Sequence, residues 1–140
     1  MRVLIGCECS GTVRDAFLKQ GHDAYSCDIK RDEYGSNRHF VADILEAIDP
    51  ANEHIYGKWD MLAVMHPPCT RLCNSGVRWL KVPPPNKTLD EMWKELDDGA
   101  ALFNSCLNAD IPHIAIENPV MHKYAKERIT SSVVKFNSFR

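Results

Sequence analysis

The chain has 140 residues, 44% of them hydrophobic and 26% charged, which is typical of one globular domain. Seventeen basic residues against nineteen acidic residues give a net charge of −2, so no overall positive charge favours nucleic acid. No apolar run reaches the roughly 18 residues of a membrane span. The six cysteines, without a secretory signal, indicate reduced thiols, and we expect a cytoplasmic protein.

Short apolar runs alternate with helical patterns along the chain. Strands are expected over residues 2–6, 23–27, 40–42, 59–65 and 111–116. Helices are expected before Gly21, before Asp49, and over residues 88–107 and 120–128. Strands that alternate with helices form βαβ units. The sequence therefore predicts a single doubly wound α/β domain with a mainly parallel, Rossmann-like sheet.

Residues 69–87 form a long irregular stretch that contains the run Pro83-Pro84-Pro85. Thr88 and Glu91 then form a capping box that opens the longest helix. The apolar residues of that helix recur every three or four positions and are expected to face the core: Leu89, Met92, Trp93, Leu96, Ala100, Phe103 and Leu107. We expect residues 1–128 to form the domain and residues 129–140 to form an irregular tail.

Two of the predicted strand ends carry reactive side chains. Cys69 follows one apolar strand and is held by Pro67 and Pro68, whereas Glu117 and Asn118 follow the last strand. Ligands of parallel sheets bind at the carboxyl ends of the strands, so we expect both groups in one crevice. A thiol and a carboxyl group there suit covalent catalysis assisted by an acid. The alternatives are a buried structural cysteine and a Glu-Asn pair that caps the next helix.

The turn after the first strand offers a candidate cofactor site. Gly6 and Gly11 let the backbone approach a nucleoside-like cofactor, and Asp28 stands about 20 residues on, where it can accept hydrogen bonds from ribose hydroxyls. Asp43, after the third strand, can meet an adenine edge. The alternatives are an ordinary tight turn and, for each aspartate, a helix N-cap or loop role.

Basic and aromatic side chains lie on the long irregular stretch. Arg71, Arg78 and Lys81 carry positive charge and Trp79 carries a ring, so this stretch can hold a phosphate and stack a base. The alternative is a solvated surface.

Two other site types are less specific. A zinc site would draw on Cys7, Cys9, Cys69, Cys73 and His66, but only one spacing fits, so no metal is expected. A Cys/His hydrolase would use His66 or His122 as its base.

Together these motifs resemble the cytosine-C5 DNA methyltransferases. Pro68-Cys69, with Ser75-Gly76 downstream, is similar to the Pro-Cys loop of that family and its closing Ser-Gly. Glu117-Asn118-Pro119-Val120 is similar to the family's Glu-Asn-Val motif. Asp28 and Asp43 stand where the family keeps acidic residues for the cofactor's ribose and adenine. Small phage-encoded methyltransferase-like proteins with a His-Pro-Pro-Cys-Thr segment are more similar still.

The resemblance implies a domain of the S-adenosylmethionine-dependent methyltransferase type that methylates C5 of cytosine in DNA. Cys69 would attack C6 of the ring, Glu117 would protonate or hydrogen-bond N3, and Asn118 would position the neighbouring loop. The target base must leave the stack to reach such a pocket. The implied cofactor-binding residues are Gly6, Cys9, Gly11, Asp28, Asp43 and Pro67. The implied substrate-binding residues are Arg71, Ser75, Gly76, Arg78 and Trp79.

The chain has no counterpart of the family's later motifs and target-recognition region. We expect a partner, or a second copy of the chain in a homodimer, to supply these parts. The alternative to an enzyme is a non-catalytic module that binds S-adenosylmethionine or a nucleotide and acts on a partner protein or on DNA. The resemblance implies a bacterial or phage-infected cell as the setting.

Overall fold

The computed structural model describes residues 1–129, which contain one five-stranded sheet. Its strands are β1 (Arg2–Gly6), β2 (Asp23–Asp28), β3 (His39–Val41), β4 (Met61–Val64) and β5 (His113–Ile116). Neighbouring strands all run parallel, in the order β3-β2-β1-β4-β5. The predicted α/β class and parallel sheet are confirmed, and the order is compatible with a Rossmann-like fold.

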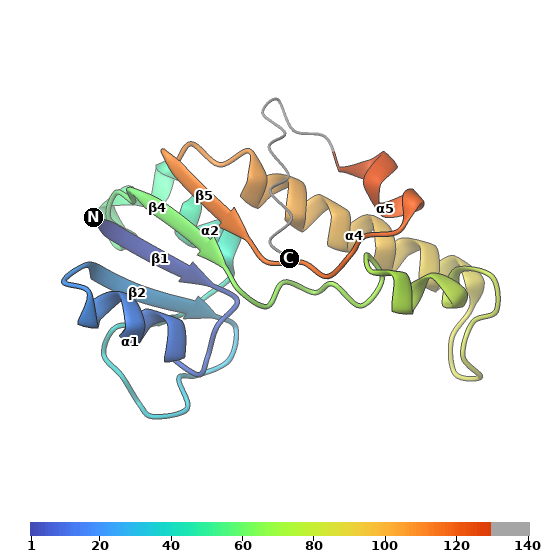
Figure 1. The fold of residues 1–140 in the computed structure, drawn as a ribbon, viewed down its shortest axis with the longest axis horizontal. Coiled ribbons are helices and arrows are strands. Elements are labelled where there is room, and N and C mark those ends of the chain that lie inside the picture. Colours follow the sequence, from blue (N-terminus) through green and yellow to red (C-terminus); the bar gives the residue numbers. More distant parts are fainter. Residues whose placement is uncertain (130–140) are drawn as a thin grey trace.

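Helices cover both faces of the sheet (Figure 1). On one face α1 (Thr12–Lys19) packs through residues such as Phe17 against Val3 and Ile5 of β1. On the other face α2 (Ile44–Ile48) and α4 (Leu89–Leu107) pack against the alternate residues of the strands, including Leu4 and Leu62. Burial on both faces explains why the central strands are apolar throughout rather than alternating.

The shorter helical segments lie between and after the strands. They are the 3₁₀ segment η1 (Pro50–Asn52), α3 (Glu53–Tyr56), the 3₁₀ segment η2 (Asn74–Leu80) and α5 (Lys123–Arg128). No helix among residues 1–129 is long and apolar enough to cross a membrane.

A second hydrophobic core lies beyond the sheet. The 19 residues of α4 make a helix about 28 Å long at a rise of about 1.5 Å per residue, and α4 extends past the sheet in Figure 1. There it packs against η2 and α5 through Leu72, Leu80, Met92, Leu96, Ala100, Phe103, Met121 and Ala125. The segments that follow β4 and β5 therefore have an apolar anchor of their own.

Several predicted boundaries were wrong in detail, including the strand predicted over 40–42, which is β3 at His39–Val41. The strand predicted over 59–65 shortens to β4, because Trp59 instead packs in the core and donates its indole N–H to the carbonyl of Ala47 at 2.9 Å. The strand predicted from residue 111 begins at His113. The helix predicted from residue 120 begins at Lys123, because His122 caps it and Met121 forms a β-bridge with Cys73.

For α4 and the stretch before it, one prediction is confirmed and two were wrong. The predicted capping box is confirmed: Glu91 N–H donates to the Thr88 hydroxyl at 3.2 Å, and Thr88 N–H donates to the Glu91 carboxylate at 2.6 Å. Leu89, predicted to face the core, is 41% exposed because it lies in the first turn. The stretch 69–87, predicted as irregular, contains η2. Residues 130–140 of the predicted tail lie outside the described residues.

Candidate active site

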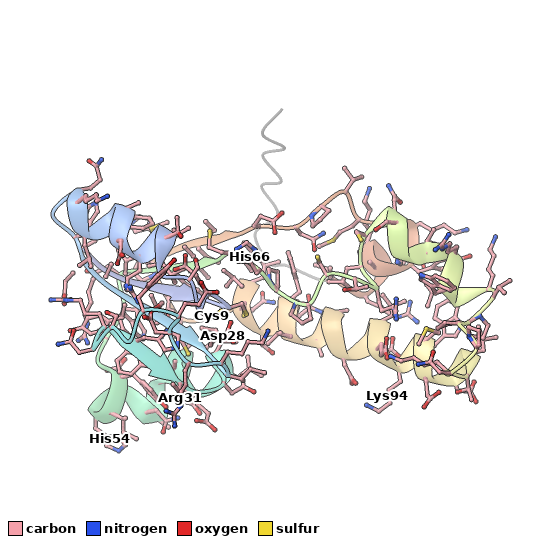
Figure 2. The ribbon with its side chains drawn as sticks, turned by 90° about the horizontal axis from the view of Figure 1, so that it is seen from below. Cys9, Asp28, Arg31, His54, His66 and Lys94 are labelled. Carbon is pink, nitrogen blue, oxygen red and sulfur yellow. The ribbon has the colours of Figure 1, made fainter. Side chains whose placement is uncertain are left out.

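The candidate site lies where the strand order reverses, at the carboxyl ends of β1 and β4. From β1 the chain proceeds to β2 and β3 on one side, and then crosses to β4 and β5 on the other. Ligands of open parallel sheets bind at such a point. In Figure 2 Cys9 and Asp28 lie together on this side, with His66 nearby, whereas His54 and Lys94 lie toward the two ends of the molecule.

The turn between β1 and α1 is closed by a buried carboxylate that our sequence analysis missed. Glu8 is 1% exposed, and it accepts hydrogen bonds from the backbone N–H groups of Val13 (2.7 Å) and Arg14 (3.3 Å) and from the Ser10 hydroxyl (3.2 Å). The N-cap position is Gly11, at φ 71°, which has no capping side chain. Glu8 therefore takes the place of a capping side chain at the N-terminus of α1. The sequence signal for this role is a glutamate three residues before a glycine at the N-cap position, because glycine has no side chain that could cap the helix.

The two predicted cofactor aspartates each have a local backbone partner. Asp28 accepts from the N–H of Lys30 at 2.9 Å, and Asp43 caps α2 by accepting from the N–H of Leu45 at 2.9 Å. These are the loop and N-cap roles that the sequence left open. Burial, with the charges of Asp28 and Asp43 nearby, raises the pKa of Cys7 to about 11. Both aspartates thus lie in one region with the turn after β1.

Gly6 and Cys9, also predicted to bind the cofactor, have structural neighbours. A Cβ at Gly6 would lie 2.7 Å from the Ile44 side chain, so the glycine lets α2 approach β1 closely. Cys9 donates its thiol toward the Glu33 carboxylate at 3.8 Å. The N–H of Glu33 in turn donates to the carbonyl of Cys9 at 3.0 Å. The turn after β1 is therefore hydrogen-bonded to the loop after β2.

A buried ion pair holds that loop against α1. Arg14 contacts the Asp32 carboxylate at 2.6 Å, and both side chains are 3% exposed. Arg14 also donates to the Ser26 hydroxyl at 3.0 Å. The backbone N–H of Ser36, together with Arg14 and the N–H of Tyr34, lowers the pKa of Asp32 to about 2. Nothing in the sequence pattern marked this pair.

The same loop presents two apolar side chains to solvent. Ile29, which directly follows Asp28, is 75% exposed, and Tyr34 is 83% exposed. Neither residue belongs to a motif that the sequence singles out. Exposed apolar side chains next to Asp28, the last residue of β2, offer a surface against which an aromatic ring of a ligand can pack.

Cys69 begins a single helical turn after β4. Its carbonyl accepts the N–H groups of Leu72 at 2.8 Å and Cys73 at 3.1 Å, and its side chain is half-buried. Burial raises the pKa of the Cys69 thiol, as do the neighbouring Cys73 and Glu117. The structure therefore brings Cys69 and Glu117 within electrostatic range of each other. The raised pKa keeps the thiol protonated at neutral pH.

Glu117 and Asn118 continue from β5 at the sheet edge. Glu117 is exposed, and its N–H donates to the carbonyl of Val64 at 2.8 Å, which extends the pairing of β5 with β4. The Asn118 side-chain amide donates to the carbonyl of Pro119. The Asn118 side-chain oxygen is buried and finds no hydrogen-bond donor among residues 1–129.

An open groove of about 580 Å³ lies beside the segments that follow β3 and β4, and Cys69, Glu117 and Asp28 are not among its lining residues. It lies between α2, the loop after β4, and α4, and its lining consists of Asp43, Leu45, Pro68, Thr70, Arg71, Glu95, Asp98, Gly99, Ala101, Leu102 and Ser105. Three of these side chains are carboxylates, of which Glu95 is paired with Arg71 at 2.7 Å and with Lys87. Pro67, the proline predicted to contact the cofactor, is buried beside the exposed Pro68.

The predicted substrate-binding residues divide into two groups. Ser75 is 2.9 Å from the Cys73 sulfur, and Gly76 packs so closely on the Thr70 carbonyl that a Cβ would overlap it. Arg71 is held by Glu95 of α4, so all three residues of this group have structural partners. Arg78 instead lies exposed, 4.2 Å from the centre of the Trp79 ring on η2, and neither of these two residues lines the groove.

The structure also bears on the two alternatives of a Cys/His hydrolase and a zinc site. His122 is buried, with Nε2 2.6 Å from the carbonyl of Arg71 and Nδ1 accepting from the N–H of Ala125 at 3.1 Å. Both ring nitrogens are thus engaged, which argues against His122 as the base of a hydrolase. Within residues 1–129, no group of three or more His, Cys, Asp or Glu side chains could hold a metal, so the zinc alternative has no site there.

In comparisons with protein-family models, curated proteins and solved structures, nothing matches this chain.

Proposed function

We propose that the chain binds S-adenosylmethionine at the carboxyl edge of its sheet and transfers the methyl group to C5 of cytosine in DNA. The observation that carries this proposal is the place of Cys69, between two residues that line an open groove of about 580 Å³ and within electrostatic range of the Glu117 carboxylate. A groove of that size suits a nucleoside-sized ligand, since ligand pockets measure roughly 300–1,000 Å³.

The charges around the site favour a cofactor without phosphate. In dinucleotide-binding folds the first helix N-terminus receives a pyrophosphate. Here the Glu8 carboxylate already accepts the N–H groups of Val13 and Arg14, so a phosphate would meet a like charge. Of the groove carboxylates, Glu95 is paired with Arg71 and Lys87 and Asp98 with Lys94, which leaves Asp43 as the one without a basic side-chain partner among the described residues. S-adenosylmethionine carries a sulfonium and an ammonium group and no phosphate.

Several residues would hold this cofactor. Asp28 would accept hydrogen bonds from the ribose hydroxyls, and Asp43 would meet the adenine edge. The exposed Ile29 side chain beside Asp28 would lie against the adenine ring. Gly6, Cys9 and Gly11 would shape the turn over which the cofactor lies.

The chain's own residues would carry the ring chemistry. The Cys69 sulfur would form a bond to C6 of a flipped-out cytosine, while Glu117 donates a proton or a hydrogen bond to N3. The cofactor supplies the methyl group that C5 then takes up. The methyl donor would leave as its uncharged thioether. The C5 proton would pass to water, and cleavage of the sulfur–C6 bond would release methylated cytosine and return the Cys69 thiolate that had attacked C6. Asn118 would position the neighbouring loop.

The raised pKa of Cys69 favours a second candidate, a non-catalytic module that binds the cofactor or a nucleotide and acts on a partner protein or on DNA. A protonated thiol is a poor nucleophile, so an enzyme must lower this pKa, or remove the proton, once cofactor and DNA have bound. A partner or second copy that supplies the target-recognition part would be one source of that change.

The experiment that decides between these functions measures transfer of a labelled methyl group to cytosine-containing DNA. We expect 5-methylcytosine with the intact chain and none with Cys69→Ser, because a hydroxyl is not an adequate nucleophile here. Cys106→Ser, at a buried cysteine outside the groove lining, is the matched control and should retain transfer. Equal transfer by Cys69→Ser would contradict the covalent mechanism, and cofactor binding without any transfer would support the non-catalytic module.

A further inference from the structure

A short antiparallel strap joins the loop after β4 to the segment after β5; it consists of residues 72–74 and 120–122. The N–H of Asn74 donates to the carbonyl of Val120 at 3.0 Å, and the N–H of His122 donates to the carbonyl of Leu72 at 3.1 Å. Between them Cys73 and Met121 form a β-bridge. The strap therefore connects the two segments that carry the candidate catalytic groups.

The His122 ring closes one end of this strap. Nδ1 accepts the N–H of Ala125, so the ring proton is assigned to Nε2, which donates to the carbonyl of Arg71 at 2.6 Å. The ring is 4% exposed. The Arg71 side chain is itself bound to Glu95 of α4. One imidazole thus links the loop after β4 to the start of α5, and through Arg71 to α4.

We propose that His122 is a positioning residue that fixes Cys69 relative to Glu117. Arg71 lies two residues after Cys69, and His122 lies five residues after Glu117, so the ring spans the two chain segments close to both groups. The catalytic consequence rests on the proposed function. The restraint that His122 places on the Cys69 loop does not rest on that function, because the alkylation rate of the Cys69 thiol reports the opening of this loop.

The test compares alkylation of Cys69 by iodoacetamide in the intact protein and in His122→Asn. Asparagine is a strong N-cap and keeps the bond from Ala125, but its side chain is too short to reach the Arg71 carbonyl. A partly buried thiol reacts when its loop opens, so we expect alkylation about tenfold faster in this variant. His122→Gln, whose longer amide can donate to Arg71, should restore slow alkylation. His54→Asn, an exposed histidine far from the strap (Figure 2), should change nothing.

Two results would overturn the proposal. One is unchanged Cys69 alkylation in His122→Asn, or alkylation as fast in His122→Gln as in His122→Asn. The other is an equal acceleration at the buried Cys106, which would mean that His122 stabilises the whole fold rather than the position of Cys69.

Kinetics separate this inference from the proposed function. If the chain methylates DNA, His122→Asn should lower kcat about tenfold and leave KM for S-adenosylmethionine unchanged. A fall in cofactor affinity instead would contradict a positioning role. Absence of methyl transfer by the intact chain would refute the proposed function alone, since the alkylation rates would still measure the positioning of Cys69.

Discussion

At the scale of single residues, buried polar side chains determine how the carboxyl edge of the sheet is built around β1 and β2. Glu8 accepts hydrogen bonds from the first backbone N–H groups of α1, and the ion pair between Arg14 and Asp32 holds the loop after β2 against that helix. A buried ion pair is costly to break, because the group that remains keeps its charge without a partner. These residues therefore fix the turn and loop on which Asp28 and Ile29 lie.

Asp32→Asn should destabilise the fold by about 3 kcal/mol, because it leaves Arg14 charged and buried. Asp15→Asn is the matched control: Asp15 also contacts Arg14, at 2.9 Å, but its side chain is 55% exposed. The control should change stability by about 0.5 kcal/mol or less. Urea unfolding at pH 7 measures both, and equal effects of the two substitutions would contradict the structural role of the buried pair.

The same carboxylate makes stability depend on pH. The pKa of Asp32 in the folded protein is about 2, below its ordinary value of 3.8. A lowered folded-state pKa stabilises the protein above the unfolded-state value, and this contribution disappears as the carboxylate is protonated. The free energy of unfolding of the intact protein should therefore fall relative to that of Asp32→Asn between about pH 4 and pH 2. If the difference in unfolding free energy between the two proteins stayed constant over that range, the lowered pKa of Asp32 in the folded protein would be contradicted.

At the scale of elements, the segment between β4 and α4 is held by close backbone contacts. Gly76 lies against the carbonyl of Thr70, and Gly99 of α4 lies against Pro68, where a Cβ would be 3.2 Å from the carbonyl oxygen. These approaches allow η2 and α4 to pack beside Cys69. The candidate nucleophile thus lies on a segment whose shape depends on glycines.

Gly76→Ala should destabilise the fold by about 3 kcal/mol, because the new methyl group meets backbone that cannot move aside easily. Gly35→Ala provides the control: its Cβ would meet nothing within 4 Å, so only its φ of 72° is unfavourable. Gly35→Ala should lower the free energy of unfolding by about 1 kcal/mol. Urea unfolding compares the two, and a Gly76→Ala protein as stable as Gly35→Ala would contradict the close approach.

At the scale of the whole molecule, α4 joins two hydrophobic cores and the candidate site lies between them. One end of α4 packs under the sheet and the other carries η2 and α5 (Figure 1). The loop after β4 passes from the first core to the second. The groove beside α2 and α4 lies along this route.

Local patterns in the sequence predicted most of the fold. Apolar runs predicted all five strands, and the pair Thr88 and Glu91 predicted the start of α4, because both signals arise from neighbouring residues. Contacts between distant residues left no such signal. Arg14 and Asp32 are 18 residues apart, and Arg71 and His122 are 51 residues apart. That Cys69 and Glu117 share one crevice stays a prediction, and the sequence could not show that Arg71 and His122 link the segments on which they lie.

Calorimetric titration of the chain with S-adenosylmethionine tests the central claim most directly. The account predicts one-to-one binding with micromolar affinity that Asp28→Ala abolishes. Asp110→Ala, an exposed aspartate that does not line the groove, should bind as the intact chain does. ADP should not bind, because Glu8 occupies the N-terminus of α1. Absence of binding by the intact chain, or equal affinity in Asp28→Ala, would contradict a cofactor site at this edge of the sheet.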